Sequence, residues 1–160
     1  MTETRLRPAV RDDRDWIVNQ HIELYRAESG FDDTFDVLVA QIATDFFENQ
    51  IPGREMAWIA ECDGAPMGSI FCTQLNNDTA QLRLFFLREQ ARGSGLGRKM
   101  LHTCMEFAHR SGYQDMRLWT HRSHASACAL YRKVGWECVG AEATVSFGQQ
   151  EVIETYVYHF

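Results

Sequence analysis

The sequence predicts a layered α/β fold, of the α+β kind, with a mixed central sheet of about six or seven strands flanked by about four helices. Segments with the period of strands and segments with the period of helices follow one another along the 160 residues. Asp63-Gly64 is a strong signal for a tight hairpin turn, so the strands around it are predicted to run antiparallel. From Ala80 onward the order strand, loop, helix, strand indicates a parallel crossover, which makes the sheet mixed.

The N-terminal third of the chain predicts one strand and two helices. Residues 4–8 form a short first strand. A helix begins at Asp12 or Asp13, either of which can cap it, and ends near Gly30. A second helix covers residues 35–47, where apolar side chains recur every three to four positions.

The rest of the chain predicts six more strands and two more helices. The strands cover residues 56–61, 67–75, 80–87, 116–120, 136–139 and 152–160. The helices run from the glycine-rich loop to Ser111-Gly112 and over residues 123–134. The first three of these strands form an antiparallel meander, and a polar segment that contains Gly148 joins the last two.

Composition and charge narrow the class of protein. A chain of 160 residues with 45% hydrophobic residues fits a single domain, residues 1–160, with one core. The net charge of −6 argues against nucleic acid as a partner, because nucleic-acid binding needs a basic face. Five cysteines without a Cys-x-x-Cys pair indicate reduced thiols, and neither a signal peptide nor a membrane-length apolar run is present. We expect a cytoplasmic protein that does not bind membranes.

The stretch from Leu84 to Leu101 carries the clearest functional signal. A strand rich in Phe and Leu runs into a loop with glycine at every second position over residues 93–97, and a helix follows. Glycines let several backbone N–H groups approach one anion, and the N-terminus of a helix adds positive potential. Arg92, Arg98 and Lys99 surround the turn with positive charge. We therefore expect this loop to bind a phosphate group.

Two familiar phosphate-binding loops do not fit this spacing. A Walker loop, Gly-x-x-x-x-Gly-Lys-Ser/Thr counted from Gly93, would need a glycine and a hydroxyl where the chain has Arg98 and Met100. A dinucleotide-binding loop, Gly-x-Gly-x-x-Gly, would need its third glycine at Arg98 and would not follow an antiparallel meander. A nucleotide-phosphate enzyme is disfavoured on both counts.

Residues 90–97, Gln-Ala-Arg-Gly-Ser-Gly-Leu-Gly, resemble the Arg/Gln-x-x-Gly-x-Gly/Ala loop of the GNAT superfamily of acetyl-CoA-dependent N-acetyltransferases. Three further segments are similar to landmarks of that family in the same order: residues 7–13, 58–69 and 129–136. The resemblance implies the GNAT acyl-CoA N-acyltransferase fold. It also implies transfer of an acetyl group from acetyl-CoA to a primary amine by direct attack.

Within the superfamily, residues 21–25, 118–120 and 146–148 resemble a bacterial subgroup whose members are often fused behind winged-helix repressors. This closer resemblance implies a bacterial protein. The partners that we expect are a small-molecule or peptide amine acceptor and, as one option, a second copy of the chain in a homodimer.

The resemblance also implies how the cofactor is held. The family splays its central strands at this point, so residues 85–87 would pair with the pantetheine amides while the loop amides bind the pyrophosphate of coenzyme A. The main-chain N–H of Leu87 would polarise the thioester carbonyl and hold the tetrahedral oxyanion. The implied cofactor-binding set is Phe85, Phe86, Leu87, Arg92, Gly93, Ser94, Gly95, Leu96, Gly97, Arg98, His124 and Tyr131.

Tyr131 occupies the position where the family commonly has its general acid. A phenol with a pKa of about 10 and a thiol with a pKa of about 8.5 are close enough to exchange a proton. The alternative is a core aromatic that packs beside Leu130. His124 stands where the family's fourth-helix motif often has Asn, so it either hydrogen-bonds the cofactor or faces solvent in the first helical turn.

The general base has three candidates. These are His121, whose intrinsic pKa of about 6.5 suits the task, Glu61 on the earlier hairpin, and a chain of solvent molecules. The strand before the loop offers no acid on either face, with Gln81, Arg83, Phe85 and Leu87 on one side and Leu82, Leu84 and Phe86 on the other. His121 and His124 have no third ligand at metal-binding spacing, so we expect no metal site.

The acceptor is the least defined part of the prediction. The acidic loop of residues 28–34 falls where the family's acceptor-binding loop varies. Asp32, Asp33 and an exposed Phe31 would attract a cationic amine, or the loop is only a solvated acidic turn. From a different class of function, the alternative to an enzyme is a non-catalytic acyl-CoA-binding module.

Overall fold

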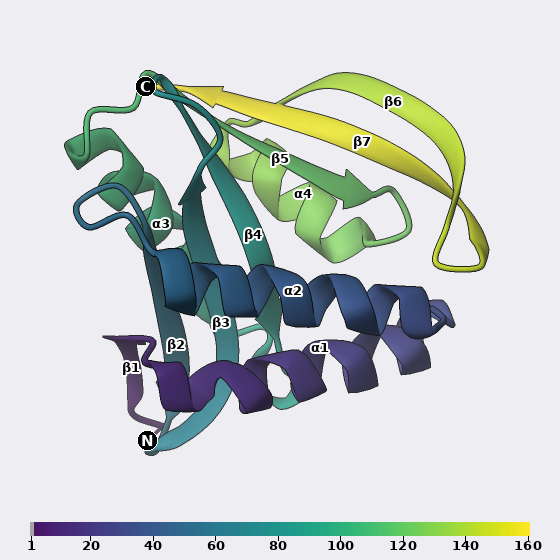
Figure 1. Cartoon of the computed structure of the whole chain (residues 1–160), viewed down its shortest axis with the longest axis horizontal. Coiled ribbons are helices and arrows are strands. Elements are labelled where there is room, and N and C mark those ends of the chain that lie inside the picture. Colours follow the sequence, from purple (N-terminus) through teal and green to yellow (C-terminus); the bar gives the residue numbers. More distant parts are fainter. Residues whose placement is uncertain (1) are drawn as a thin grey trace.

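A computed structural model describes residues 2–160 as one mixed seven-stranded sheet with four α-helices, as the sequence predicted (Figure 1). The sheet order is β1-β2-β3-β4-β5-β7-β6, and β4–β5 is its parallel pair. The strands are β1 (Thr4–Pro8), β2 (Met56–Cys62), β3 (Ala65–Gln74), β4 (Thr79–Leu87), β5 (Asp115–His121), β6 (Glu137–Ser146) and β7 (Gln149–His159). The helices are α1 (Arg14–Ser29), α2 (Asp33–Asn49), α3 (Leu96–Arg110) and α4 (Ala125–Val134), with short 3-10 turns at Arg11–Asp13 and Glu89–Ala91.

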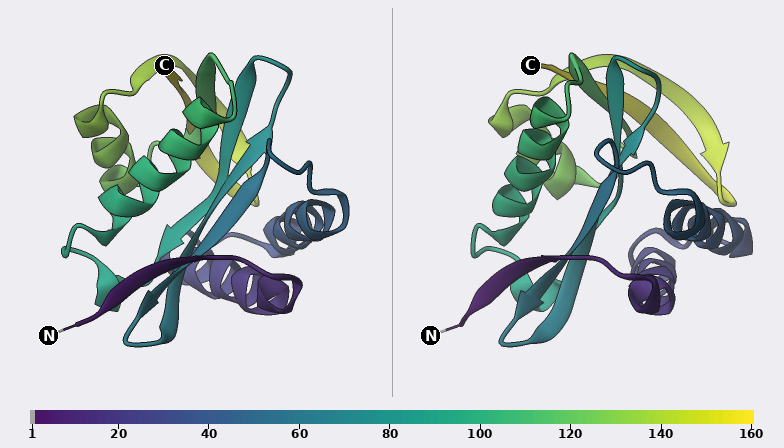
Figure 2. Two further views of the ribbon diagram at one scale, coloured as in Figure 1. Left: turned by 90° about the vertical axis from the view of Figure 1, so that its left-hand side faces the viewer. Right: turned by 60° about the vertical axis from the view of Figure 1, so that its left-hand side comes forward.

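The helices cover the two faces of the sheet in pairs. Helices α1 and α2 lie on one face and α3 and α4 on the other (Figure 2). The core on the α3 side contains Met100, Leu101 and Cys104 of α3 together with Tyr131 of α4. Ile17 of α1 belongs to the smaller cluster on the opposite face.

The end of α1 is confirmed at Gly30, but the predicted cap at its start is not, because the Asp13 side chain makes no capping hydrogen bond to α1. Gly30 ends α1 in a left-handed conformation, with φ of +66°, and its N–H donates to the Arg26 carbonyl over 3.1 Å. The side chain of Asp32 caps α2 by accepting the Thr34 N–H over 3.0 Å. The two helices therefore follow one another with only a short connection through Phe31 and Asp32.

Strands β4 and β5 separate soon after they meet. Their pairing covers Thr79–Gln81 and Asp115–Arg117 and goes no further among the described residues. Beyond Gln81 the edge of β4 that faces β5 carries backbone groups without a strand partner. The opening predicted from the family resemblance is thus present.

A bulge in β4 changes which side chains face each layer. Between the pairs Ser69↔Phe86 and Phe71↔Arg83 the register shifts, and Leu84 inside the bulge has a φ of +45°. Leu82, Phe85 and Leu87 belong to the core on the α3 side, while Leu84 and Phe86 pack toward α1 and α2. The regular alternation predicted for this strand is therefore wrong from the bulge onward.

Two other sequence predictions are corrected. Phe31, expected to be exposed in an acidic loop, is buried, with only 3% of its surface exposed. The polar segment before Gly148 is not a loop, because β6 continues to Ser146 and turns tightly through residues 147–148 into β7. The last two strands thus form one long β6–β7 hairpin.

All five cysteines are free thiols, as expected. No helix within residues 2–160 has both the length and the apolar character required to span a membrane.

Candidate active site

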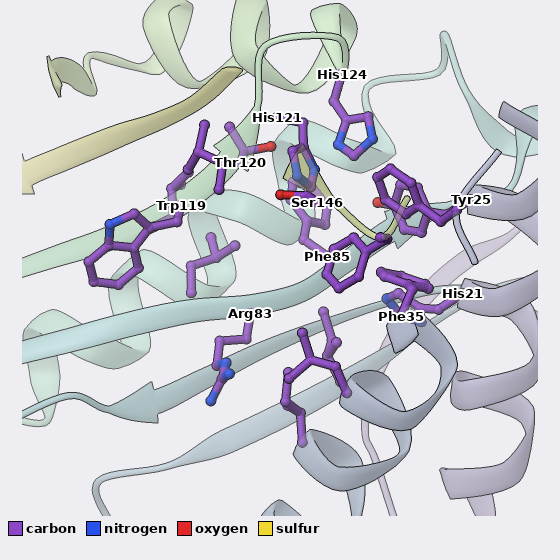
Figure 3. Close-up of a pocket in the computed structure, with 18 of the residues that line it drawn as sticks. His21, Tyr25, Phe35, Arg83, Phe85, Trp119, Thr120, His121, His124 and Ser146 are labelled. Carbon is purple, nitrogen blue, oxygen red and sulfur yellow. The ribbon is translucent and has the colours of Figure 1, made fainter. Parts of the chain in front are cut away.

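A cavity of about 320 Å³ lies where β4 and β5 separate. Its walls come from β4 and β5, from α1 and α2, from α4 and from the β6–β7 turn. Figure 3 shows labelled side chains from several of these elements around one space, with Trp119 and Arg83 toward one side and Tyr25, His21 and Phe35 toward the other. The topology thus brings together groups that are far apart in the sequence.

The main-chain N–H of Leu87 points into the opening between the strands. Arg88 N–H donates to the Met67 carbonyl of β3 over 2.8 Å. Because neighbouring residues of a strand direct their amides to opposite sides, the Leu87 N–H faces away from β3. This is the direction that a donor to a bound thioester carbonyl requires.

Phe86 is turned the other way. It pairs with Ser69 of β3, and its ring packs against Trp16 at 5.6 Å and His21 at 4.6 Å between centroids. Phe85, on the other face, lines the cavity. Of the strand residues predicted to pair with a cofactor, Phe86 does not reach the opening.

The glycine-rich loop presents a row of unpaired amides. Within residues 2–160, the N–H groups from Gly93 to Arg98 have no hydrogen-bond acceptor, and the row ends where Lys99 N–H donates to the Gly95 carbonyl over 3.1 Å. Gly93 and Gly95 both have a φ near +80°, at +82° and +81°, which favours glycine. Six successive donors at the start of α3 form a site suited to a phosphate anion.

The other predicted loop residues take different positions. The side chain of Leu96 is buried in the core, so only its amide faces the loop. Arg92 is fixed, because its Nε–H donates to the Leu87 carbonyl over 2.8 Å and its guanidinium lies 3.3 Å from the carboxylate of Glu28. Ser94 donates to the Ala91 carbonyl, which braces the turn, and Arg98 is exposed at the start of α3.

Tyr131 is buried on α4 and lines the cavity. Its ring lies 6.3 Å from Phe85 and 5.6 Å from Tyr156, measured between centroids. Burial, with Tyr25 as a further contribution, raises the pKa of Tyr131 well above its ordinary value. The phenol is therefore protonated at neutral pH.

His121 and His124 both lie at the cavity, with ring centroids 5.4 Å apart. His124 stacks beside Tyr25 at 4.9 Å and shares a 3.3 Å hydrogen bond with the Ser29 hydroxyl, so it does not face solvent. Burial lowers the pKa of His124 to about 4 and also lowers the pKa of His121. Both rings are neutral near pH 7, and Nε2 of His121 is buried without a partner within the described chain.

Comparison with known families decides what kind of protein has this geometry. Residues 18–136 match the model of the acetyltransferase (GNAT) family, which is most of the chain. The chain belongs to this family.

Relatives of this GNAT chain are distant in sequence and close in fold. N-acetyltransferase family 8 member 2 of Rattus norvegicus is 30% identical over 121 residues, which is 72% of this chain and 53% of that protein. The chain spans about half the length of the curated relatives it matches.

Two solved structures show the same fold. An N-acetyltransferase from Staphylococcus aureus Mu50 superposes with a TM-score of 0.81 at 16% identity, covering 98% of both chains. The yncA structure from Salmonella typhimurium, determined with its cofactor acetyl-CoA, has a TM-score of 0.76 at 16% identity, over 98% of this chain and 94% of that one.

Three candidate residues from the sequence lie away from the cavity of this GNAT chain. Glu61 is held by Arg7 at 2.9 Å on the β1–β2 side and lines no part of the cavity, so it is not a base there. Asp32 is used to cap α2, and neither it nor Asp33 lines the cavity. Among residues 2–160 no group of three His, Cys, Asp or Glu side chains could hold a metal ion.

The sequence analysis missed the part of the cavity formed by α1. His21 is buried beside Phe86, with its Nδ1–H donating to the Ile17 carbonyl over 2.7 Å. Tyr25 lies one turn further on and stacks against Phe31 at 5.9 Å. Helical spacing was the available signal, because positions 17, 21 and 25 fall on one face.

Proposed function

We propose that this chain is an N-acetyltransferase that moves an acetyl group from acetyl-CoA to a primary amine by direct attack. The observation that carries the proposal is the row of unpaired amides from Gly93 to Arg98 at the end of an unpaired strand edge. The row suits a pyrophosphate, and the edge suits the amides of a pantetheine arm. The proposal concerns this 160-residue chain, which spans about half the length of its curated relatives.

In this proposal the cofactor is held mainly by the main chain. The amides of residues 93–98 bind the pyrophosphate, and backbone groups of Phe85 and Leu87 pair with the pantetheine arm. Arg92 acts indirectly, because it braces the Leu87 carbonyl from the loop. Arg98 and His124 are proposed as further contacts to the cofactor.

The reaction needs a neutral amine, a polarised carbonyl and a proton for the thiolate. The amine nitrogen attacks the thioester carbon, and the Leu87 N–H stabilises the oxyanion that forms. As the C–S bond breaks, Tyr131 gives its proton to the departing sulfur. His121 accepts the proton that the nitrogen loses, since its lowered pKa leaves it unprotonated at neutral pH.

Two measurements test the proposal together. Isothermal titration should detect acetyl-CoA and CoA binding, and a thiol-release assay across a panel of primary amines should detect turnover. No binding at near-millimolar concentration would overturn the proposal. Binding without thiol release from any amine would instead support a non-catalytic acyl-CoA-binding module.

We further propose a bacterial, cytoplasmic setting and membership of the subgroup often fused to winged-helix repressors. The supporting observations are the free thiols and the segments over residues 118–120 and 146–148. A homodimer is also proposed, because the edge strand β6 exposes Val139 and Val145. Light scattering on the purified chain tests the dimer.

A further inference from the structure

The cavity contains one permanent charge. Of the described side chains that line it, Arg83 alone is an arginine or lysine, and none is an aspartate or glutamate. The other polar side chains of the wall are neutral, and most of the wall is aromatic or aliphatic. A cavity with this composition favours an acceptor that carries a negative charge.

Arg83 has no partner among residues 2–160. Its guanidinium makes no hydrogen bond, and no carboxylate lies within the 4.0 Å limit of an ion pair. Asp45 of α2 is the carboxylate that influences it from a greater distance. By contrast, Arg7 and Arg26 each hold a carboxylate at 2.8 Å or less. A half-buried guanidinium without an acceptor is suited to receive one from a ligand.

Arg83 lies away from the reacting end of the cavity. It precedes Leu87 by four residues, and a strand rises about 3.3 Å per residue, so their Cα atoms are separated by up to about 13 Å. In Figure 3 Arg83 and Trp119 both lie toward the side of the cavity opposite Tyr25 and His124. A spacer between the negative group and the amine would let one acceptor reach both Arg83 and Leu87.

Much of the cavity wall is apolar. Leu38 and Ile42 of α2 and Trp119 of β5 line the cavity together with Arg83. Such a surface contacts a hydrocarbon or aromatic segment favourably and gives no hydrogen-bond partner to a polar one.

We propose that the acceptor is a primary amine joined through an apolar spacer to a carboxylate, and that Arg83 binds this carboxylate. The inference rests on the proposed acetyltransferase function and specifies its acceptor. Arginine binds a carboxylate through two parallel N–H donors, which fixes orientation as well as adding affinity. The amine is then directed toward Leu87 and Tyr131.

Three amines of matched shape test the proposal. The probes are 4-(aminomethyl)benzoate, with a carboxylate, 4-methylbenzylamine, with a methyl group, and 1,4-bis(aminomethyl)benzene, with a second amine. In a thiol-release assay the carboxylate probe should show the highest kcat/KM and the diamine the lowest. Charged hydrogen bonds of this kind change kcat/KM by about 10- to 100-fold.

Variants of Arg83 separate recognition from chemistry. Arg83→Gln should lower kcat/KM for the carboxylate probe by about 10- to 100-fold and leave the methyl probe within about 3-fold. Arg83→Lys should retain part of the preference, since the charge remains without the fork. Arg110→Gln removes the same charge from α3, where Arg110 is exposed and outside the cavity, and should change neither probe. Acetyl-CoA affinity should be unchanged in all three variants.

Each failure points to one claim. Loss of acetyl-CoA binding in the unmodified chain overturns the acetyltransferase itself. If acetyl-CoA binds but the methyl probe matches or exceeds the carboxylate probe, or Arg83→Gln leaves their ratio unchanged, the acceptor inference is wrong. A chain that binds acetyl-CoA and acetylates other amines but not the carboxylate probe also contradicts the acceptor inference. Carboxylate-dependent thermal stabilisation that is lost in Arg83→Gln supports the inference without turnover.

Discussion

Replacement of Gly95 by alanine tests whether the loop amides bind the cofactor. Gly95 has a φ of +81°, and a Cβ added there meets no atom within 4 Å, so the substitution costs backbone strain and no steric clash. An L-residue in this region costs about 1–2 kcal/mol. The loop is exposed and its amides from 93 to 98 are unpaired, so in the free Gly95→Ala variant the backbone relaxes away from this conformation.

Binding must then restore the strained geometry. The expected result is a dissociation constant for CoA raised by about 5- to 30-fold, the equivalent of about 1–2 kcal/mol, with almost no change in melting temperature. Isothermal titration and thermal unfolding of the same preparations measure the two quantities. Gly95→Asn should lose less affinity, because asparagine tolerates the left-handed region better.

Gly64→Ala is a matched control. Gly64 has the same φ of +81° and the same empty surroundings, but it lies in the β2–β3 turn, where strand pairing holds the backbone. The backbone strain of an alanine at position 64 should therefore lower the melting temperature and leave the CoA affinity unchanged. An unchanged CoA affinity in Gly95→Ala would refute the phosphate-binding role of this loop, whether or not the melting temperature changes.

Three further predictions concern single side chains. Tyr131→Phe keeps the buried ring and removes the proton, so kcat should fall about 100-fold or more while CoA affinity stays within about 2-fold; an unchanged kcat would exclude Tyr131 as the acid. Burial lowers the pKa of His21 to about 4, so the unfolded chain binds this proton more readily than the folded one. The contribution of His21 to the free energy of unfolding is then constant above about pH 6.5 and falls by about 2 kcal/mol between pH 6.5 and 5. Urea unfolding should find this dependence on pH reduced in His21→Phe. Glu154 is buried and accepts hydrogen bonds from Tyr156 at 2.9 Å and Arg122 at 3.2 Å, which outweigh burial and hold its carboxyl pKa below the ordinary range. Glu154→Gln should destabilise the fold by about 2 kcal/mol near pH 7, a difference that shrinks as the pH falls through the carboxyl range; equal melting temperatures at pH 7 would contradict this.

Most element positions were predictable because their signals are local. The Asp63-Gly64 turn, the end of α1 at Gly30 and the start of α3 after the glycines all depend on backbone preferences of nearby residues. The splay of β4 and β5 came from the family resemblance, since no local pattern states where two strands stop pairing.

The errors arise where distant partners decide the outcome. Phe31 stands among acidic residues, yet it is buried by Phe147 at 4.9 Å and His121 at 5.2 Å, both far away in the sequence. Strand β6 was predicted too short because nearly all its side chains are exposed, so the alternation that marks a half-buried strand is absent. The β4 alternation failed at Leu84, where the bulge adds a residue without any glycine to announce it.

The candidate site also has one part that local sequence predicts and another that depends on the folded structure. The amide row was predictable from glycine spacing. The base was not, because its identity depends on which side chains the folded strands bring to the cavity. Glu61 was a candidate base in the sequence, but its ion pair with Arg7 holds it on the β1–β2 side. The sequence placed Arg83 on a strand but did not indicate a binding role, because the sequence does not show whether an arginine has a partner in the folded protein.

The row of amides and the unpaired edge of β4 consist of atoms that every residue type except proline supplies. Apart from Gly93 and Gly95, whose positive φ favours glycine, substitutions in the proposed coenzyme half leave its donors in place. The proposed acceptor half would use side chains such as Arg83 and Trp119. It would also use the β6–β7 turn, which lies beyond residue 136, where the family match ends. On the proposed function, substitutions in the acceptor half would therefore change which amine is bound and leave the coenzyme half intact.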